Sequence, residues 1–154
     1  MYVLLHRGHD RDMDGIVSLK KTVTEYAMLT GPDHLVVTVA DIPVAVDFYT
    51  RVLGLEARYR DNERVDLMLG DMALRLHQLE TPVNPKATHP TPGSLDLCVR
   101  SVLPLEEVQA HLRALQIPIE VGPVSRQGAN GPIVSLYLRD PDGNLIEISR
   151  PERD

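Results

Sequence analysis

Hydrophobic and polar positions follow a regular pattern from residue 33 onward. Residues 34–39 are mostly apolar and β-branched, which predicts a strand, and Asp41 and Pro43 are suited to begin a helix directly after it. Apolar residues then recur at helical spacing until Gly54, which predicts the end of the helix. Further strands are predicted over residues 56–60, 65–69 and 72–79, with a tight turn at 70–71. The predicted order is β-α-β-β-β.

The second half of the chain repeats this order. Residues 82–93 lie between the two halves and contain four prolines. Because proline is disfavoured in helix interiors and central strands, this segment is predicted to be a connector without regular structure. The second half is predicted to contain a strand over 95–100, a helix from Pro104 to about Leu115, strands over 117–121, 133–139 and 145–149, a long loop over 122–131 and a turn at 140–143. His34 precedes Asp96 by 62 residues and Pro43 precedes Pro104 by 61, so the first strand and helix of the two halves align within one residue.

This internal duplication predicts an α+β fold of two tandem β-α-β-β-β modules, which form a curled mixed sheet around a central cleft. We expect one domain over residues 31–153, made of module 31–81, connector 82–93 and module 94–150. Residues 1–30 form an N-terminal extension outside the repeat. Loose helical spacing of Ile16, Leu19, Val23 and Tyr26 indicates an extra helix there.

Composition excludes several classes of protein. The 154 residues are 43% hydrophobic and 25% charged, as in ordinary globular domains, and the net charge of −6 argues against a nucleic-acid partner. The apolar runs are too short to span a bilayer, so no membrane association is expected. Cys98 is the only cysteine and forms no internal disulfide; we expect it to be a small core residue. A cytoplasmic location follows as the default.

Strand parity places four metal-competent side chains on one face of the predicted sheet. Alternate residues of a strand face opposite sides, and one face is aliphatic throughout, including Leu74, Leu76, Ile146 and Ile148. The opposite face carries His34, His77, Asp96 and Glu147. Buried carboxylates need partners, and two imidazoles with two carboxylates form a ligand set that suits Zn, Ni, Co, Mn or Fe. Each of these residues taken alone also fits an edge or surface position.

Three segments resemble the vicinal oxygen chelate superfamily, which includes glyoxalases, bleomycin-resistance proteins and extradiol dioxygenases. They are residues 34–39, 48–54 and 140–147. Residues 85–94 and 131–137 resemble more closely the subgroup of glyoxalase domain-containing protein 5, with its bacterial relatives described as virulence proteins. The resemblance implies paired modules and a metal in the cleft, with His34 and Glu147 at the most regular ligand positions. Glyoxalase I has a carboxylate where His77 stands and a histidine where Asp96 stands, so the two types are exchanged here.

The resemblance implies a metal-dependent, lactoylglutathione lyase-type isomerisation through an enediolate, acting on a small dicarbonyl–thiol adduct, with glutathione as a possible co-substrate. Glu147 is the first candidate for ligand and base, and Asp96 the second. Arg75, Arg126 and Tyr137 are candidate substrate-binding residues, Arg126 lying in the predicted loop. Two alternatives stay open: an Fe(II)/Mn(II) extradiol-type dioxygenase using His34, His77 and Glu147, and a metal-free binding protein of the bleomycin-resistance kind. We also expect a homodimer, with ligands contributed by one or two chains.

Overall fold

The computed structural model describes residues 29–60, 64–81 and 83–152 of the chain. Residues 32–154 form one compact unit, and the description below concerns that unit. The helix expected within the N-terminal extension falls outside the described residues. Two mixed four-stranded sheets and two helices make up the described part, which agrees with the predicted α+β class.

The first module has the predicted order of elements. It contains β1 (His34–Val39), α1 (Ile42–Arg51), β2 (Glu56–Tyr59), β3 (Val65–Leu69) and β4 (Met72–Gln78). Helix α1 begins as expected, because the Asp41 carboxylate accepts a hydrogen bond from the backbone N–H of Val44 at 2.9 Å. Gly54 follows the helix with φ of 71°, a conformation that favours glycine. The strand order in the sheet is β1-β4-β3-β2, with β1 and β4 parallel.

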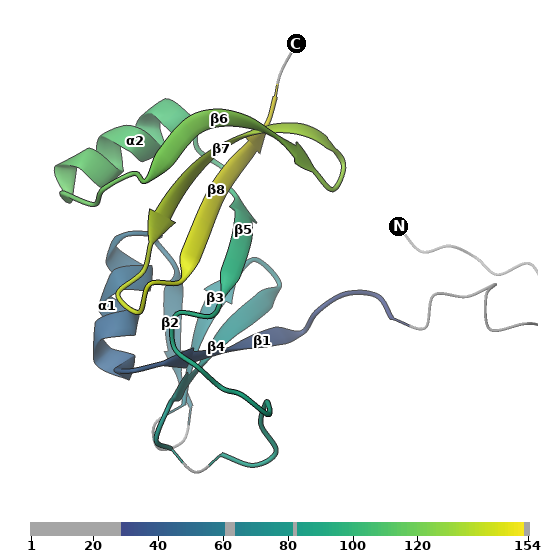
Figure 1. Cartoon of the computed structure of the whole chain (residues 1–154), viewed down its shortest axis with the longest axis vertical. Coiled ribbons are helices and arrows are strands. Elements are labelled where there is room, and N and C mark those ends of the chain that lie inside the picture. Colours follow the sequence, from purple (N-terminus) through teal and green to yellow (C-terminus); the bar gives the residue numbers. More distant parts are fainter. Residues whose placement is uncertain (1–28, 61–63, 82, 153–154) are drawn as a thin grey trace, which may run out of the picture. The chain divides into compact units, whose positions relative to one another are not determined.

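The second module repeats the arrangement of the first. It contains β5 (Asp96–Arg100), α2 (Leu105–Ala114), β6 (Val121–Gly128), β7 (Gly131–Arg139) and β8 (Leu145–Pro151). The sheet order β5-β8-β7-β6 matches that of the first sheet, and β5 and β8 are likewise parallel. Figure 1 shows the second sheet above the first, with α1 and α2 on the same side of the domain. Strands β1 and β5 therefore each form one edge of a sheet.

Strand β6 is the main correction to the predicted elements. Residues 117–121 were expected to form the strand and 122–131 a loop, but the strand is Val121–Gly128 and includes Arg126. Gly122 and Pro123 favour a loop when read in isolation. They are accommodated because β6 is an edge strand whose pairing with β7 is irregular between Val121 and Val124. The backbone oxygen of Ser135 approaches Gly122 so closely that a side chain there would collide with it.

The predicted aliphatic face forms the core. Leu74, Leu76, Leu136, Leu138 and Ile146 are all at most 1% exposed. Buried residues of both modules belong to one continuous cluster, so the modules pack through this face. Leu35 is an exception at 41% exposed, since it lies at the start of the edge strand β1. The opposite face of each sheet, with the candidate site residues, lies away from the shared core.

The turn between β7 and β8 ties the two modules together. Asp140 is buried, and its carboxylate accepts hydrogen bonds from the Tyr49 hydroxyl of α1 at 2.9 Å and from the Asn144 side-chain amide at 2.7 Å. Burial is the main reason that the pKa of Tyr49 is raised, so its hydroxyl stays a donor. The backbone N–H of Ala40 donates to the Asp142 carboxylate at 3.1 Å. We call residues 140–144 the inter-module turn.

Candidate functional site

The four candidate metal ligands divide between two surfaces of the chain. His34 and His77 lie on β1 and β4 of the first sheet, with Arg75 between them in register. Asp96 and Glu147 lie on β5 and β8 of the second sheet. Among the described residues, which include all four, no group of three or more His, Cys, Asp or Glu side chains is placed to share a metal ion. The four side chains therefore do not converge within one chain.

The imidazole face, defined by His34, Arg75 and His77, is an extended network of charges. The Arg75 guanidinium donates to both oxygens of Asp66, at 2.8 and 3.1 Å, and a third nitrogen lies 3.1 Å from His34 Nε2. His34 Nδ1 lies 2.7 Å from the exposed Asp33 carboxylate. Both ring nitrogens of His34 thus have partners. A guanidinium can only donate, so Nε2 is assigned as the acceptor and Nδ1 as the nitrogen that carries the proton and donates to Asp33.

His77 has a different environment on the same face. Burial lowers its pKa, and the positive charges of Arg64 and Arg75 lower it further, so the neutral imidazole is favoured. His77 also lines a small pocket of about 100 Å³ together with Thr38 of β1 and Pro85 and Lys86 of the connector. The proline-rich connector thus forms one wall beside this histidine.

The carboxylate face, defined by Asp96, Tyr137 and Glu147, holds the other candidates. The buried Ser135 hydroxyl donates to Glu147 Oε1 at 2.5 Å, and Tyr137 is the cross-strand neighbour of Glu147. Arg126 places its guanidinium 5.6 Å from the centre of the Tyr137 ring and donates from Nε to the Tyr137 hydroxyl at 3.2 Å. Glu147 Oε1 is thereby held in place, while Asp96 is exposed at the sheet edge.

Cys98 also lies on the carboxylate face. It was expected in the core, but it is exposed, because it shares strand parity with Asp96 and not with Leu97. Its sulfur is partly buried under neighbouring side chains, and this partial burial together with the Glu147 charge raises the pKa of the thiol, which favours the protonated form. The structure gives no reason to assign it a nucleophilic role.

Two important side chains were given no role in the sequence analysis. Ser135 falls on the same face as Tyr137 by strand alternation, but its hydrogen bond to Glu147 was not predicted. Asp66 is an acidic residue within an apolar strand, only 1% exposed. The predicted turn at Gly70-Asp71 sets the register of the hairpin and places Asp66 directly opposite Arg75. The ion pair could therefore have been predicted from the sequence.

The Asp66 ion pair gives a prediction for acid stability. Hydrogen bonds from Arg75 hold the pKa of the Asp66 carboxyl below its ordinary value of 3.8, and Arg60 adds a contact at 2.7 Å. Because the pKa is lower in the folded than in the unfolded chain, the ionised carboxylate contributes to the free energy of unfolding at every pH above the unfolded-state pKa. That contribution is lost as the pH falls through the folded-state pKa. We expect Asp66→Asn to lower the free energy of unfolding by about 3 kcal/mol at pH 7, because Arg75 is left half-buried without its partner.

The measurement is urea unfolding of the wild type and Asp66→Asn at pH 7 and at several values below 4. The difference in free energy of unfolding between the two proteins should shrink as the pH falls, because protonation removes the Asp66 charge in the wild type as well. Asp71→Asn, an exposed acid in the adjacent turn, is the matched control. A constant difference down to pH 2 would contradict the ion-pair explanation.

With this geometry established, the class of protein is clear from comparison with known families. The family model described as glyoxalase/bleomycin resistance protein/dioxygenase superfamily matches residues 31–148, and the chain belongs to that superfamily. Its tandem modules agree with the fold of that family's members.

Particular relatives narrow the subgroup. The chain is 48% identical over 118 residues to virulence protein STM3117 of Salmonella typhimurium, covering 77% of this chain and 82% of that protein. Its crystal structure superposes with a TM-score of 0.79 at 45% identity, over 82% of this chain and all of that one. Glyoxalase domain-containing protein RDO1 of Mycosarcoma maydis is 45% identical over 117 residues, covering 76% of this chain and 66% of that protein.

A solved structure with an enzyme name is more distant. Lactoylglutathione lyase from Agrobacterium tumefaciens superposes with a TM-score of 0.61 at 26% identity, over 79% of this chain and 93% of that one. The superfamily thus includes enzymes of the glyoxalase type. In the described part of the chain, neither helix has the length and apolar character needed to cross a membrane.

Proposed function

We propose that this chain is a metal-dependent, glyoxalase-like enzyme that acts as a homodimer on a small dicarbonyl–thiol adduct or a related oxygen-rich compound. Superfamily membership supports the general class of chemistry. The observation that carries the proposal is the division of the candidate ligands into an imidazole face and a carboxylate face, each beginning at an open edge strand of its own sheet.

A second copy of the chain would bring the two faces together. If β1 of one subunit lies beside β5 of its partner, His34 and His77 face the partner subunit's carboxylate face, and two equivalent sites form around a twofold axis. The donor types support this arrangement, since the imidazole face supplies two ring nitrogens and the carboxylate face supplies the oxygens of Asp96 and Glu147. Pairing of the edge strands would also satisfy backbone groups exposed at both edges.

The donor set of the joined faces fits a borderline divalent ion. His34, His77, Asp96 and Glu147 would hold it, and no thiolate is required. When bound, such an ion supplies positive charge that stabilises an oxyanion developing on the substrate. His34 needs to turn from Arg75 to contribute its Nε2, since that nitrogen is the one in contact with the guanidinium.

Glu147 is the residue we assign to proton transfer. Ser135 holds Oε1, which leaves Oε2 to take the carbon-bound proton of the adduct and return it to the neighbouring carbon. Asp96 is the second candidate for this role. Tyr137 and Arg126 lie beside Glu147 and supply donors to substrate oxygens, and Arg75 supplies a positive charge to an anionic end such as that of glutathione.

One contact favours an alternative function. The Arg75 guanidinium at His34 Nε2 places a fixed positive charge beside a nitrogen that a metal would need. A metal-free protein that binds a drug or metabolite would retain this contact. Metal analysis of the purified protein separates the two: about one divalent ion per chain supports the enzyme, and its absence after loading supports the binding protein.

The activity screen should use the metal-loaded protein with methylglyoxal and several thiols, including glutathione. Isomerisation of the hemithioacetal is the expected result. Oxygen uptake on catechols by iron-loaded protein would instead favour an extradiol-type dioxygenase, which His34, His77 and Glu147 also fit as a ligand set.

Mixing two inactive variants tests whether each site spans two chains. His34→Ala and Glu147→Gln chains, unfolded together and refolded in equal amounts, form heterodimers in about half of all dimers, and each heterodimer has one site without a substitution. We expect about a quarter of the wild-type activity to return. Activity no higher than that of either variant alone would place each site within one chain.

A further inference from the structure

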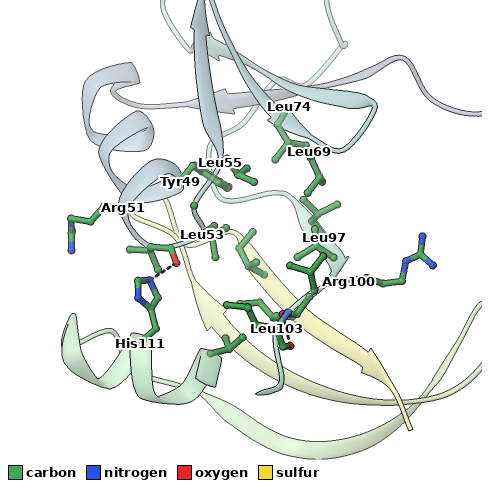
Figure 2. Close-up of a pocket in the computed structure, with 18 of the residues that line it drawn as sticks. Tyr49, Arg51, Leu53, Leu55, Leu69, Leu74, Leu97, Arg100, Leu103 and His111 are labelled. Carbon is green, nitrogen blue, oxygen red and sulfur yellow. Dashed lines mark hydrogen bonds between the residues drawn. The ribbon is translucent and has the colours of Figure 1, made fainter. Parts of the chain in front are cut away.

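A second cavity lies between the two modules, on the core side of the sheets. It has a volume of about 520 Å³ and is lined by Leu55 and Leu74 of the first module and by Leu97, Val99 and Ile148 of the second. Figure 2 shows leucines from both modules pointing into the same space. These side chains have the opposite strand parity to His77 and Glu147, so the cavity is separate from the candidate metal site.

The size and lining of this cavity are those of a small-molecule site. Ligand pockets typically enclose about 300 to 1,000 Å³ and are mainly apolar, with a few polar groups at defined positions. At the mouth, Val102 is 92% exposed and Leu103 is 49% exposed, which extends the apolar surface outward. Apolar surface left in contact with water is unfavourable, and an apolar occupant would remove it from water.

The charged groups at the rim of the cavity include one arginine that is not part of an ion pair among the described residues, Arg100, whereas Arg51 donates to the Asp47 carboxylate at 3.1 Å. Arg51, Arg100 and His111 lie there with a single acidic residue, Glu107. Figure 2 shows Arg51 and Arg100 on opposite sides, with guanidinium groups extending away from the leucines, while His111 Nε2 lies 3.1 Å from the Val52 carbonyl oxygen. An anionic group on the Arg100 side of the mouth would meet that guanidinium while the rest of its molecule remained among the leucines.

We propose that the inter-module cavity binds an amphiphile with an apolar body and one anionic end group, of the size and chemistry of a medium-chain carboxylate. The aliphatic lining recognises the body through its apolar area and sets no strict requirement on its shape. Arg100 at the rim recognises the end group. This site does not depend on the metal or on the proposed isomerase activity.

A chain-length series measures the apolar part of the interaction. Octanoate, decanoate and dodecanoate are titrated into the full chain by calorimetry, below their micelle concentrations. We expect the affinity to rise about fourfold for each methylene that enters the cavity, which corresponds to about 0.8 kcal/mol per methylene. Dodecanol should bind more weakly than dodecanoate because it lacks the negative charge. The difference should be only about two- to fivefold, because ion pairs at an exposed rim contribute little free energy. Equal affinity across the series would overturn the proposal.

Cavity and rim variants locate the binding site. Leu97→Trp fills the space and should abolish dodecanoate binding, whereas Tyr59→Trp adds the same side chain at an exposed position and should not. Val99→Phe is a smaller filling variant for use if Leu97→Trp does not fold, as judged by thermal unfolding. Arg100→Gln should weaken dodecanoate binding and leave dodecanol unaffected, with Arg113→Gln on α2 as its control.

A second copy of this chain is the competing occupant of the cavity mouth. Unchanged affinity in both filling variants would overturn the proposal. Failure of dodecanoate to bind the wild type, together with dissociation of a dimer by Val102→Asp, would also overturn it and assign the mouth to a subunit interface. Binding that follows chain length and is lost in the filling variants would support it.

Discussion

Asp140→Ala should lower the free energy of unfolding by about 4 kcal/mol, one of the largest effects of any single substitution in this domain. The Asp140 carboxylate accepts four hydrogen bonds, from the Tyr49 hydroxyl, the Asn144 side chain and the backbone N–H groups of Asp142 and Asn144. Tyr49 is 0% exposed and Asn144 is 1% exposed, so removing the carboxylate leaves buried donors without an acceptor. Each such donor costs about 1 to 3 kcal/mol.

Chemical unfolding of the wild type and three variants tests this account. Tyr49→Phe removes only one donor and should cost about 1 kcal/mol. Asp71→Ala, in the exposed turn of the first module, occupies the corresponding hairpin and should change stability by less than about 0.5 kcal/mol. If Asp140→Ala costs no more than Asp71→Ala, the inter-module turn does not hold the modules together.

The elements of the fold were largely predictable because their causes are local. Asp41 and Gly54 mark the ends of α1 through their own side-chain and backbone properties, and alternation along β4 and β8 identifies the buried face. Strand β6 was misplaced because Gly122 and Pro123 interrupt strands in most settings. Only the position of β6 at the sheet edge, a property of the whole module, makes the proline tolerable.

The contacts between modules and the arrangement of the site depend on tertiary structure. The sequence 140–144 indicates a turn, but nothing local shows that Asp140 meets Tyr49, which is 91 residues away. The parity that selected His34, His77, Asp96 and Glu147 placed all four on the outward faces of their strands, as the structure has them. Parity does not show which sheets face each other, so it suggested a convergence that one chain does not produce.

Glu147→Gln should reduce turnover in the proposed isomerisation by about 10² to 10⁴-fold, because it removes the proton acceptor while keeping the size of the side chain. The glutamine oxygen still accepts the hydrogen bond from Ser135, so the fold should be little affected. Loss of the negative charge should also reduce the metal content of the protein. The measurements are the turnover number, the metal bound per chain and the temperature of unfolding.

Glu120→Gln is the matched control, since Glu120 is an exposed glutamate of the same module, paired with Arg139 at 2.7 Å on the surface. It should retain both activity and metal. A Glu147→Gln protein with normal metal content and reduced turnover would assign Glu147 to proton transfer alone, with the remaining three side chains sufficient to hold the ion. Full activity in Glu147→Gln would instead exclude it as the base and make Asp96, the remaining carboxylate on that face, the residue to substitute next.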